Sequence, residues 1–108
     1  MQSEEVFQVF RDTKALLTGH FELRSGLHSD QYFQCAMVMQ YPRIAARLCA
    51  ALGDKWSRTG RQVDGVIAPA MGGLVIGQEL GRHLDRRFIF AEKQDGKLVL
   101  RRFDIQPG

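Results

Sequence analysis

The sequence predicts an α/β fold in which a parallel sheet is flanked by helices. Two patterns predict it: residues 63–91 read as strand, glycine-rich loop, helix and strand, and residues 88–100 read as a hairpin around Asp95-Gly96. A strand–helix–strand unit joins two parallel neighbours by a crossover that is right-handed in nearly all known cases. A chain of 108 residues has room for one small domain.

The N-terminal segment predicts a helix that begins at Ser3. The Ser3 hydroxyl can cap the helix, and the carboxylates of Glu4 and Glu5 suit its positive end. Apolar residues recur at helical spacing as far as Leu17, so the helix is expected to end near Gly19.

Residues 20–39 change to alternating aromatic and apolar positions, broken by Ser25-Gly26. This alternation predicts two short strands around a turn.

The second half of the chain begins with a helix expected from Pro42, with Gly53 as its stop. Residues 54–62 are expected to form a surface connection in which Trp56 packs on that helix. A strand at 63–68, a loop at 69–73, a helix at 74–84 and a strand at 87–91 follow. We therefore divide the single domain into residues 1–40 and 41–108.

Composition excludes several classes of protein. The apolar fraction of 44 % and the charged fraction of 25 % are those of an ordinary globular chain. The longest apolar stretch, residues 66–77, is too short for a membrane span and contains Pro69, and the N-terminus lacks a secretory pattern. We expect a cytoplasmic protein without a membrane partner. Cys35 and Cys49 are too few for a disulfide framework and are expected to be inert.

The loop Pro69-Ala70-Met71-Gly72-Gly73 stands between the predicted buried strand and helix. Glycines let a ligand approach the backbone, and free N–H groups at a helix start attract an anion, so the amides of 70–73 are candidate pyrophosphate ligands. The pattern is neither a Walker loop nor a dinucleotide fingerprint. A tight turn without ligand is the alternative.

Positive charge is concentrated near the C-terminus, where Lys93, Lys97, Arg101 and Arg102 surround the hairpin. The net charge of +3 is mild, and the pattern suits an anionic small molecule. Neither interleaved aromatic residues nor a recognition helix supports nucleic acid as a partner.

Segments 19–33, 63–73, 90–93 and 101–103 together resemble the orotate phosphoribosyltransferases. Gly19-His-Phe-Glu-Leu-Arg-Ser-Gly26 with Ser29-Asp-Gln-Tyr-Phe33 is similar to that family's signature. Val63 to Gly73 is similar to its pyrophosphate loop, and Phe90-Ala-Glu-Lys93 with Arg101-Arg102-Phe103 is similar to its mobile catalytic loop.

The resemblance implies a partial type I phosphoribosyltransferase fold, with an N-terminal hood element and a β-hairpin mobile loop. It implies transfer of ribose 5-phosphate from phosphoribosyl pyrophosphate to orotate, Mg²⁺ bound through the substrate pyrophosphate, and a homodimer. The catalytic candidates are Lys93, Lys97 and Arg101. The residues expected to border the orotate are Arg24, Ser25, Gly26, Tyr32 and Phe33. Tyr32 and Phe33 would form a flat wall for the pyrimidine ring, and the alternative is that they only pack in the core.

The chain also lacks what the resemblance would require for a complete enzyme. No acidic pair precedes a Thr- and Gly-rich turn, the family's ribose-phosphate loop, and Gly72 stands where several members carry lysine. We therefore expect no turnover by this chain alone and an unpaired edge on the strand at 63–68. The alternatives are a non-catalytic sensor of a nucleotide or phosphoribosyl pyrophosphate, and a remnant that only binds other proteins.

The three histidines carry no role in this interpretation. His20, His28 and His83 each lack a partner at a fixed spacing and are expected to be solvated or to cap.

Overall fold

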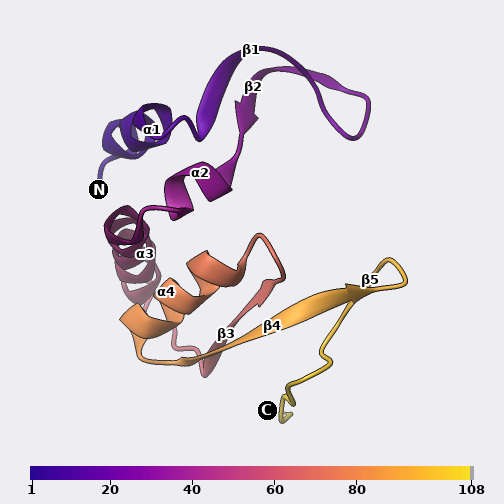
Figure 1. Cartoon of the computed structure of the whole chain (residues 1–108). Helices are drawn as coiled ribbons and strands as arrows, with labels where there is room; N and C mark the ends of the chain where they lie inside the picture. The colour runs from indigo at the N-terminus through magenta and orange to yellow at the C-terminus, as the bar shows by residue number, and fades with distance from the viewer. Residues whose placement is uncertain (108) are drawn as a thin grey trace. The chain divides into compact units, whose positions relative to one another are not determined.

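The computed structural model describes residues 1–107, and its backbone contacts divide the chain into two compact units, Met1–Ile44 and Ala45–Gly108. The first unit contains α1 (Ser3–Asp12), β1 (Leu16–Glu22), β2 (His28–Phe33) and α2 (Cys35–Met39). Helix α3 (Pro42–Ser57) crosses the boundary. The second unit continues with β3 (Gly65–Pro69), α4 (Leu74–Leu84), β4 (Arg87–Gln94) and β5 (Lys97–Val99) (Figure 1).

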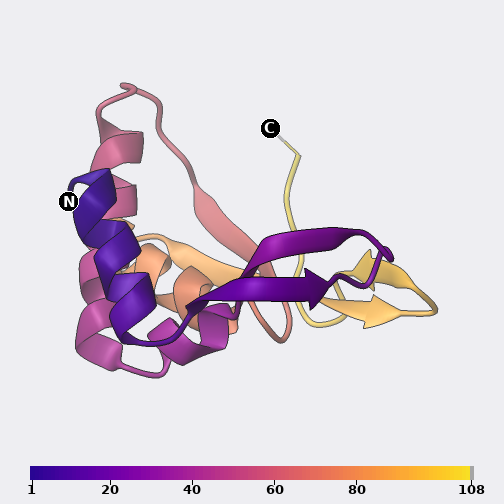
Figure 2. The ribbon, with the colours of Figure 1, turned by 90° about the horizontal axis from the view of Figure 1, so that it is seen from above.

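The first unit is built on the antiparallel pair β1–β2. Leu16 pairs with Phe33 and Glu22 with His28, and the register shifts between Thr18 and Phe21. The predicted hairpin is therefore confirmed, with its first strand starting before residue 20. The strand prediction is wrong for residues 35–39, which form α2. Figure 2 shows the two strands running from the end of α1 out to their turn.

Helix α1 ends at Asp12, so the predicted end near Gly19 is wrong. Lys14 takes a left-handed conformation, φ 63°, and its amide donates to the Arg11 carbonyl while the Ala15 amide donates to the Phe10 carbonyl at 2.8 Å. These two bonds form a Schellman-type helix end. The sequence does not reveal this helix end, because the left-handed position usually carries glycine and here carries Lys14. The N-terminal cap also differs: it falls on Gln2, without a side-chain hydrogen bond from Ser3.

Replacing Lys14 with glycine is expected to raise the free energy of unfolding by about 0.5–1 kcal/mol, because a left-handed conformation costs a side chain with a Cβ more than it costs glycine. Urea denaturation followed by circular dichroism measures the change. Lys14→Ala retains the Cβ and is the matched control, without a gain. A loss of stability in Lys14→Gly would contradict the assignment.

The second unit is an α/β unit. Strands β3 and β4 are parallel, from Gly65 opposite Arg87 to Pro69 opposite Ala91, and α4 lies between them in the chain (Figures 1 and 2). Strands β4 and β5 form an antiparallel hairpin around Asp95 and Gly96. Both turn residues have positive φ, 53° and 79°, as a two-residue type I′ turn requires. The bounds of α4 and the hairpin turn are confirmed.

Close packing against glycine holds α4 on the sheet. Gly77 and Gly81 are buried, and a Cβ on Gly77 would lie 2.2 Å from a ring carbon of Phe88. Ile89 and Ala91 are buried on β4, at 6 % and 8 % exposure, and Cys49 of α3 is 1 % exposed.

Helix α3 continues past Gly53 to Ser57, so the predicted stop at Gly53 is wrong. The position is buried, and a Cβ there would meet the His83 ring at 2.4 Å. His83 in turn lies 3.0 Å from the Asp54 carboxylate. Gly53 therefore admits an imidazole from α4, and Trp56 lies inside the helix and not beyond it.

Strand β3 is the edge of its sheet, whose order is β3-β4-β5. This agrees with the expected unpaired edge. Association through that edge stays a prediction.

Candidate functional site

The loop between β3 and α4 leaves two of its four backbone amides, those of Met71 and Gly72, open to a ligand. The Ala70 amide donates to the Ala91 carbonyl at 2.7 Å, and the Gly73 amide donates to the Pro69 carbonyl at 2.9 Å. Within residues 1–107 the amides of Met71 and Gly72 have no acceptor. Of the four predicted pyrophosphate donors, two are therefore used by the fold and two are open to a ligand.

The two loop glycines have different surroundings. A Cβ on Gly73 would lie 2.8 Å from the Pro69 carbonyl oxygen and 2.9 Å from the Ala68 Cβ, so Gly73 lets the chain close tightly behind β3. A Cβ on Gly72 would meet nothing within 4 Å. Gly72 therefore leaves open space beside the unsatisfied amides, at a helix start that favours an anion.

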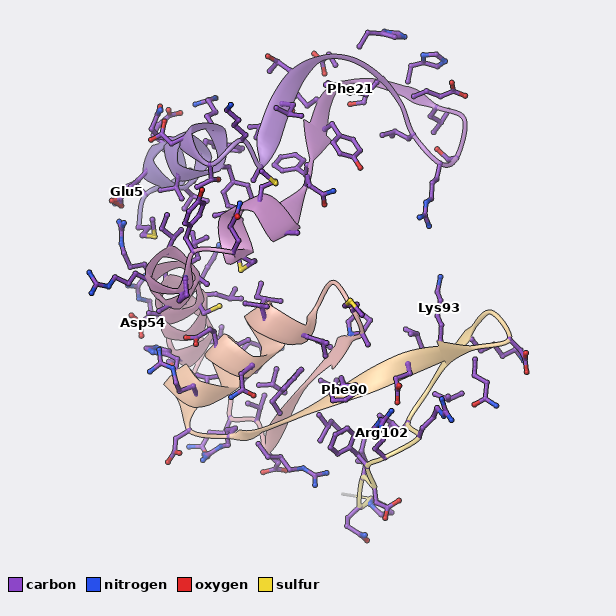
Figure 3. The ribbon with its side chains drawn as sticks, viewed as in Figure 1. Glu5, Phe21, Asp54, Phe90, Lys93 and Arg102 are labelled. Atoms are coloured by element: carbon purple, nitrogen blue, oxygen red, sulfur yellow. The ribbon has the colours of Figure 1, made fainter. Side chains whose placement is uncertain are left out.

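The cations of the β4–β5 hairpin do not share one face. Lys93 pairs with Leu98, whereas Lys97 pairs with Gln94, one position further along β4. Because successive side chains of a strand point to opposite faces, Lys93 and Lys97 lie on opposite faces of the ladder. Figure 3 shows Lys93 projecting from one side of β4 and Arg102 lying on the other.

The tail after β5 is attached to the face of β4 opposite Lys93. Arg102 Nε donates to a Glu92 carboxylate oxygen at 3.0 Å, and the Phe103 ring meets Phe90 edge-on at 5.1 Å between centroids. The hydrogen bond from Arg102 lowers the pKa of Glu92, and Arg101 contributes a smaller effect of the same sign. Arg101 is therefore near Glu92, so the three catalytic candidates are not brought into one cluster.

The ion pair predicts a pH-dependent stability. The pKa of Glu92 in the folded chain lies below its ordinary value of 4.5, so its contribution is complete above that value and is lost as the pH falls through the folded pKa. The stability difference between the wild type and Glu92→Gln should therefore shrink from pH 7 to about pH 3. Urea denaturation across this range measures it.

Arg102→Gln is the matched variant for that series. It should reproduce the pH dependence of Glu92→Gln, because it removes the donor that lowers the pKa. A stability difference that stays constant with pH would contradict the pairing.

The turn of the first unit presents Arg24 and Ser25 to solvent. The Gly26 amide donates to the Leu23 carbonyl at 2.9 Å, with Gly26 at φ 85°, and the Leu27 amide lies 3.4 Å from Ser25 Oγ. The Arg24 guanidinium makes no hydrogen bond or ion pair within the described part of the chain and is available to an anion.

Tyr32 and Phe33 do not form the common wall that we expected. They are successive residues of β2 and so point to opposite faces. The Tyr32 ring lies 5.6 Å from Phe21, whereas Phe33 meets Phe10 of α1 edge-on at 6.0 Å. Packing therefore accounts for Phe33, and the flat aromatic pair is Phe21 with Tyr32. Phe21 is part of the family signature, but the sequence does not reveal that its ring lies against Tyr32.

The two cysteines differ in exposure. Burial raises the pKa of the Cys49 thiol, and the nearby Glu79 carboxylate adds to the effect, as expected of an inert cysteine. Cys35 is exposed.

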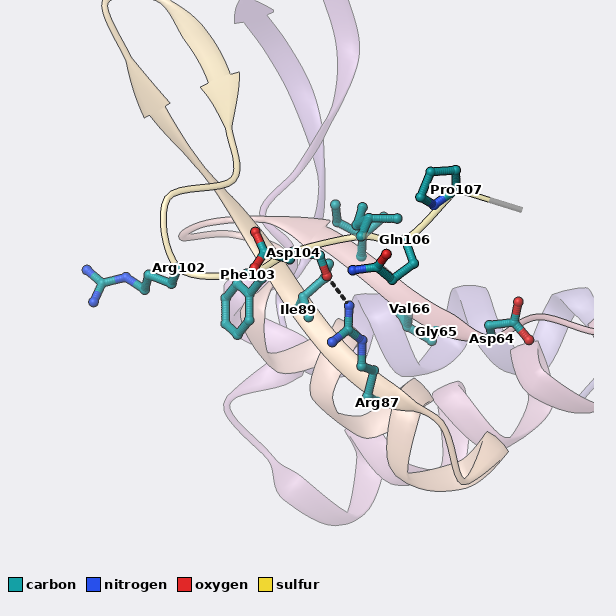
Figure 4. A pocket seen from close by; sticks show the side chains of 12 residues that line it. Asp64, Gly65, Val66, Arg87, Ile89, Arg102, Phe103, Asp104, Gln106 and Pro107 are labelled. Carbon is teal, nitrogen blue, oxygen red and sulfur yellow. Dashed lines mark hydrogen bonds between the residues drawn. The ribbon is translucent and has the colours of Figure 1, made fainter.

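A hollow of about 700 Å³ lies along the open edge of β3, beneath the tail (Figure 4). Gly65, Val66 and Ile67 line it from the strand and Phe103 to Pro107 from the tail, which Arg87 fastens by a hydrogen bond to the Asp104 carbonyl. None of the predicted site residues lines it. It is a sheet edge covered loosely by the tail.

Comparison with known proteins finds relatives of one kind. The sequence is 46 % identical over 109 residues to the orotate phosphoribosyltransferase of Desulforamulus reducens and 51 % identical over 110 residues to that of Erythrobacter litoralis. Both alignments cover the whole chain. Over its whole length the chain is similar to orotate phosphoribosyltransferases. No protein-family model matches the sequence.

Solved structures support the family's fold. The structure titled Leishmania donovani UMP synthase matches 84 % of the chain and 20 % of its own with a TM-score of 0.72 at 23 % identity. The orotate phosphoribosyltransferase of Francisella tularensis matches 88 % of the chain and 49 % of its own with a TM-score of 0.67 at 20 % identity. At these identities the likeness shows the fold alone, a partial phosphoribosyltransferase fold, as expected.

The chain spans about half the length of the family members it matches, 56 % for Desulforamulus reducens and 57 % for Erythrobacter litoralis. It is therefore part of the family's full domain. No helix within residues 1–107 is long and apolar enough to cross a membrane.

Proposed function

We propose that this chain carries the orotate-binding and pyrophosphate-binding parts of an orotate phosphoribosyltransferase. The reaction transfers ribose 5-phosphate from phosphoribosyl pyrophosphate to orotate, giving orotidine 5'-monophosphate and pyrophosphate in pyrimidine nucleotide biosynthesis. The observation that carries the proposal is the pair of open amides at Met71 and Gly72, at the start of α4, in a chain whose relatives bear that enzyme's name.

The loop amides suit the leaving group. As the bond between ribose and pyrophosphate breaks, negative charge accumulates on the pyrophosphate oxygens, so donors beside them stabilise the transition state more than the ground state. The Met71 and Gly72 amides are placed in advance by the bonds of Ala70 and Gly73 to the strands. Such preorganised donors need no rearrangement during the reaction.

Lys93, Lys97 and Arg101 would supply positive charge to the same oxygens. They differ in their surroundings: in the described part of the chain Lys93 projects from the hairpin without a partner, whereas Arg101 lies near Glu92, to which the tail after β5 is bound. We therefore propose Lys93 as the principal cation. Lys97, beside the turn, can approach only from the opposite face of the hairpin.

Mg²⁺ enters this proposal with the substrate. When bound to pyrophosphate oxygens and water it neutralises part of their charge, an arrangement that needs few protein ligands. The chemistry of the loop fits such a complex, because amide N–H groups bind oxygens that the ion leaves free.

Orotate would occupy the first unit. Its carboxylate suits the unpaired guanidinium of Arg24 and the hydroxyl of Ser25 beside Gly26, and its flat ring suits the Phe21–Tyr32 pair. Phe33 supports the hairpin through Phe10 in this arrangement. A cytoplasmic homodimer completes the proposal for the whole protein.

Calorimetric titration of the purified chain with orotate and with Mg²⁺–phosphoribosyl pyrophosphate tests the proposal. We expect both to bind, Arg24→Ala to weaken orotate, and Lys93→Ala to weaken phosphoribosyl pyrophosphate. Binding of phosphoribosyl pyrophosphate or a nucleotide without binding of orotate would favour a non-catalytic sensor. Binding of neither orotate nor phosphoribosyl pyrophosphate would favour a remnant that only binds other proteins. A steady-state assay should detect no orotidylate from this chain alone, since it contains no acidic ribose-binding loop.

A further inference from the structure

Two imidazoles meet on the exposed hairpin of the first unit. His28 Nδ1 lies 2.7 Å from His20 Nε2, and the ring centroids are 4.7 Å apart. Both residues are exposed, so solvent and ions reach them. The sequence expectation that each histidine lacks a partner is therefore wrong for this pair, and it is also wrong for His83, which lies 3.0 Å from the Asp54 carboxylate.

The strand register explains the meeting. His28 pairs with Glu22, and His20 stands two residues before Glu22 on β1. Glu22 and His28 share a face because they are directly paired, and His20 lies in the stretch between Thr18 and Phe21 where the register shifts. The contact is thus built into the pairing of β1 with β2.

A hydrogen bond between two neutral imidazoles holds one proton between two ring nitrogens. Those same nitrogens can hold a metal ion in place of the proton when each ring carries its own proton on the other nitrogen. Zinc–imidazole bonds of about 2.0–2.1 Å in a tetrahedral site place two nitrogens about 3.3 Å apart, so the rings need to separate only slightly.

We propose that His20 and His28 form a two-imidazole site for a divalent transition-metal ion of the Zn²⁺ class. Imidazole prefers Zn²⁺, Ni²⁺ and Cu²⁺ to Mg²⁺. Within residues 1–107 no group of three or more histidine, cysteine or carboxylate side chains could hold a metal, so water completes the coordination. The carboxylate of Glu22, the residue paired with His28, adds favourable charge.

A bound ion would link β1 to β2 next to their turn and so stabilise the hairpin. His20 and His28 come from different strands on either side of residues 23–27, and an ion bound to both joins them. Because only the paired strands bring both rings together, binding stabilises the folded hairpin. The inference does not depend on the proposed enzymatic function.

Calorimetry with Zn²⁺ and Ni²⁺, on metal-free protein without a histidine tag, tests the site. We expect one ion per chain, with binding weakened at least about tenfold in His20→Asn and in His28→Asn. Mg²⁺ should not compete. His83→Asn and Cys35→Ser are the controls and should bind the ion as the wild type does. The four variants together test all three histidines and the exposed thiol.

Nuclear magnetic resonance of the histidine rings in the unmodified chain provides a second readout that no folding defect can imitate. Zn²⁺ should shift the ring signals of His20 and His28 and leave those of His83 in place. Absence of binding, binding that survives both hairpin substitutions, or loss of binding in Cys35→Ser or His83→Asn would overturn the proposal.

Discussion

Gly77→Ala is expected to lower the free energy of unfolding of the second unit by about 1–3 kcal/mol, although alanine is the better helix former. The added Cβ would lie 2.2 Å from one Phe88 ring carbon and 2.8 Å from two others. Relief requires the ring to turn or α4 to move off the sheet. Urea denaturation followed by the fluorescence of Trp56, the single tryptophan, measures the loss.

The cause can be isolated with a second substitution. Phe88→Leu removes part of the ring, so Gly77→Ala should cost less in the Phe88→Leu background than in the wild type. Gln78→Ala, on the adjacent exposed position of α4, is the matched control and should change stability by less than about 0.5 kcal/mol. Equal costs of Gly77→Ala in both backgrounds would show that the ring is not the obstacle.

Gly72→Val is expected to weaken pyrophosphate binding at least about tenfold and to leave stability nearly unchanged. A Cβ at this position meets no protein atom, so the branched side chain would instead occupy the space beside the Met71 and Gly72 amides. Titration calorimetry with Mg²⁺–pyrophosphate measures the affinity, and urea denaturation measures the stability.

Gly73→Ala is the contrasting variant. Its Cβ would meet the Pro69 carbonyl and Ala68, so it should cost about 1–3 kcal/mol of stability because backbone cannot easily move aside. If Gly72→Val lost stability as Gly73→Ala does, or bound pyrophosphate as the wild type does, the loop would serve only to turn the chain.

The second unit illustrates how local signals predict structure. Asp95-Gly96 predicted the β4–β5 turn because both positions need positive φ, which these two residues tolerate well. The bounds of α4 followed from apolar spacing and the glycines before it. The family resemblance rested on motifs in the right order and is confirmed by relatives that match the entire chain.

The candidate site was only partly predictable. The sequence marked the loop 70–73 and the hairpin cations, but it could not tell Gly72 from Gly73, or place Lys93 and Lys97 on opposite faces. Those distinctions depend on which atoms of other segments lie nearby. The contact of Phe21 with Tyr32 was missed for the same reason, and Arg24 was identified only through the motif around it.

By itself the sequence determined the succession of elements in the α/β unit, the hairpin turn and the family, because these depend on residues close together in the chain. Only the tertiary structure decided where α1 ends, why Gly53 lies inside a helix and which histidines meet. Lys14 closes a helix through bonds that no propensity predicts, and Gly53 admits the ring of a residue thirty positions away. Contacts between distant segments set the position of Gly53 and the meeting of the histidines, whereas the left-handed conformation of Lys14 sets the end of α1. Periodicity along the chain carries no record of these features.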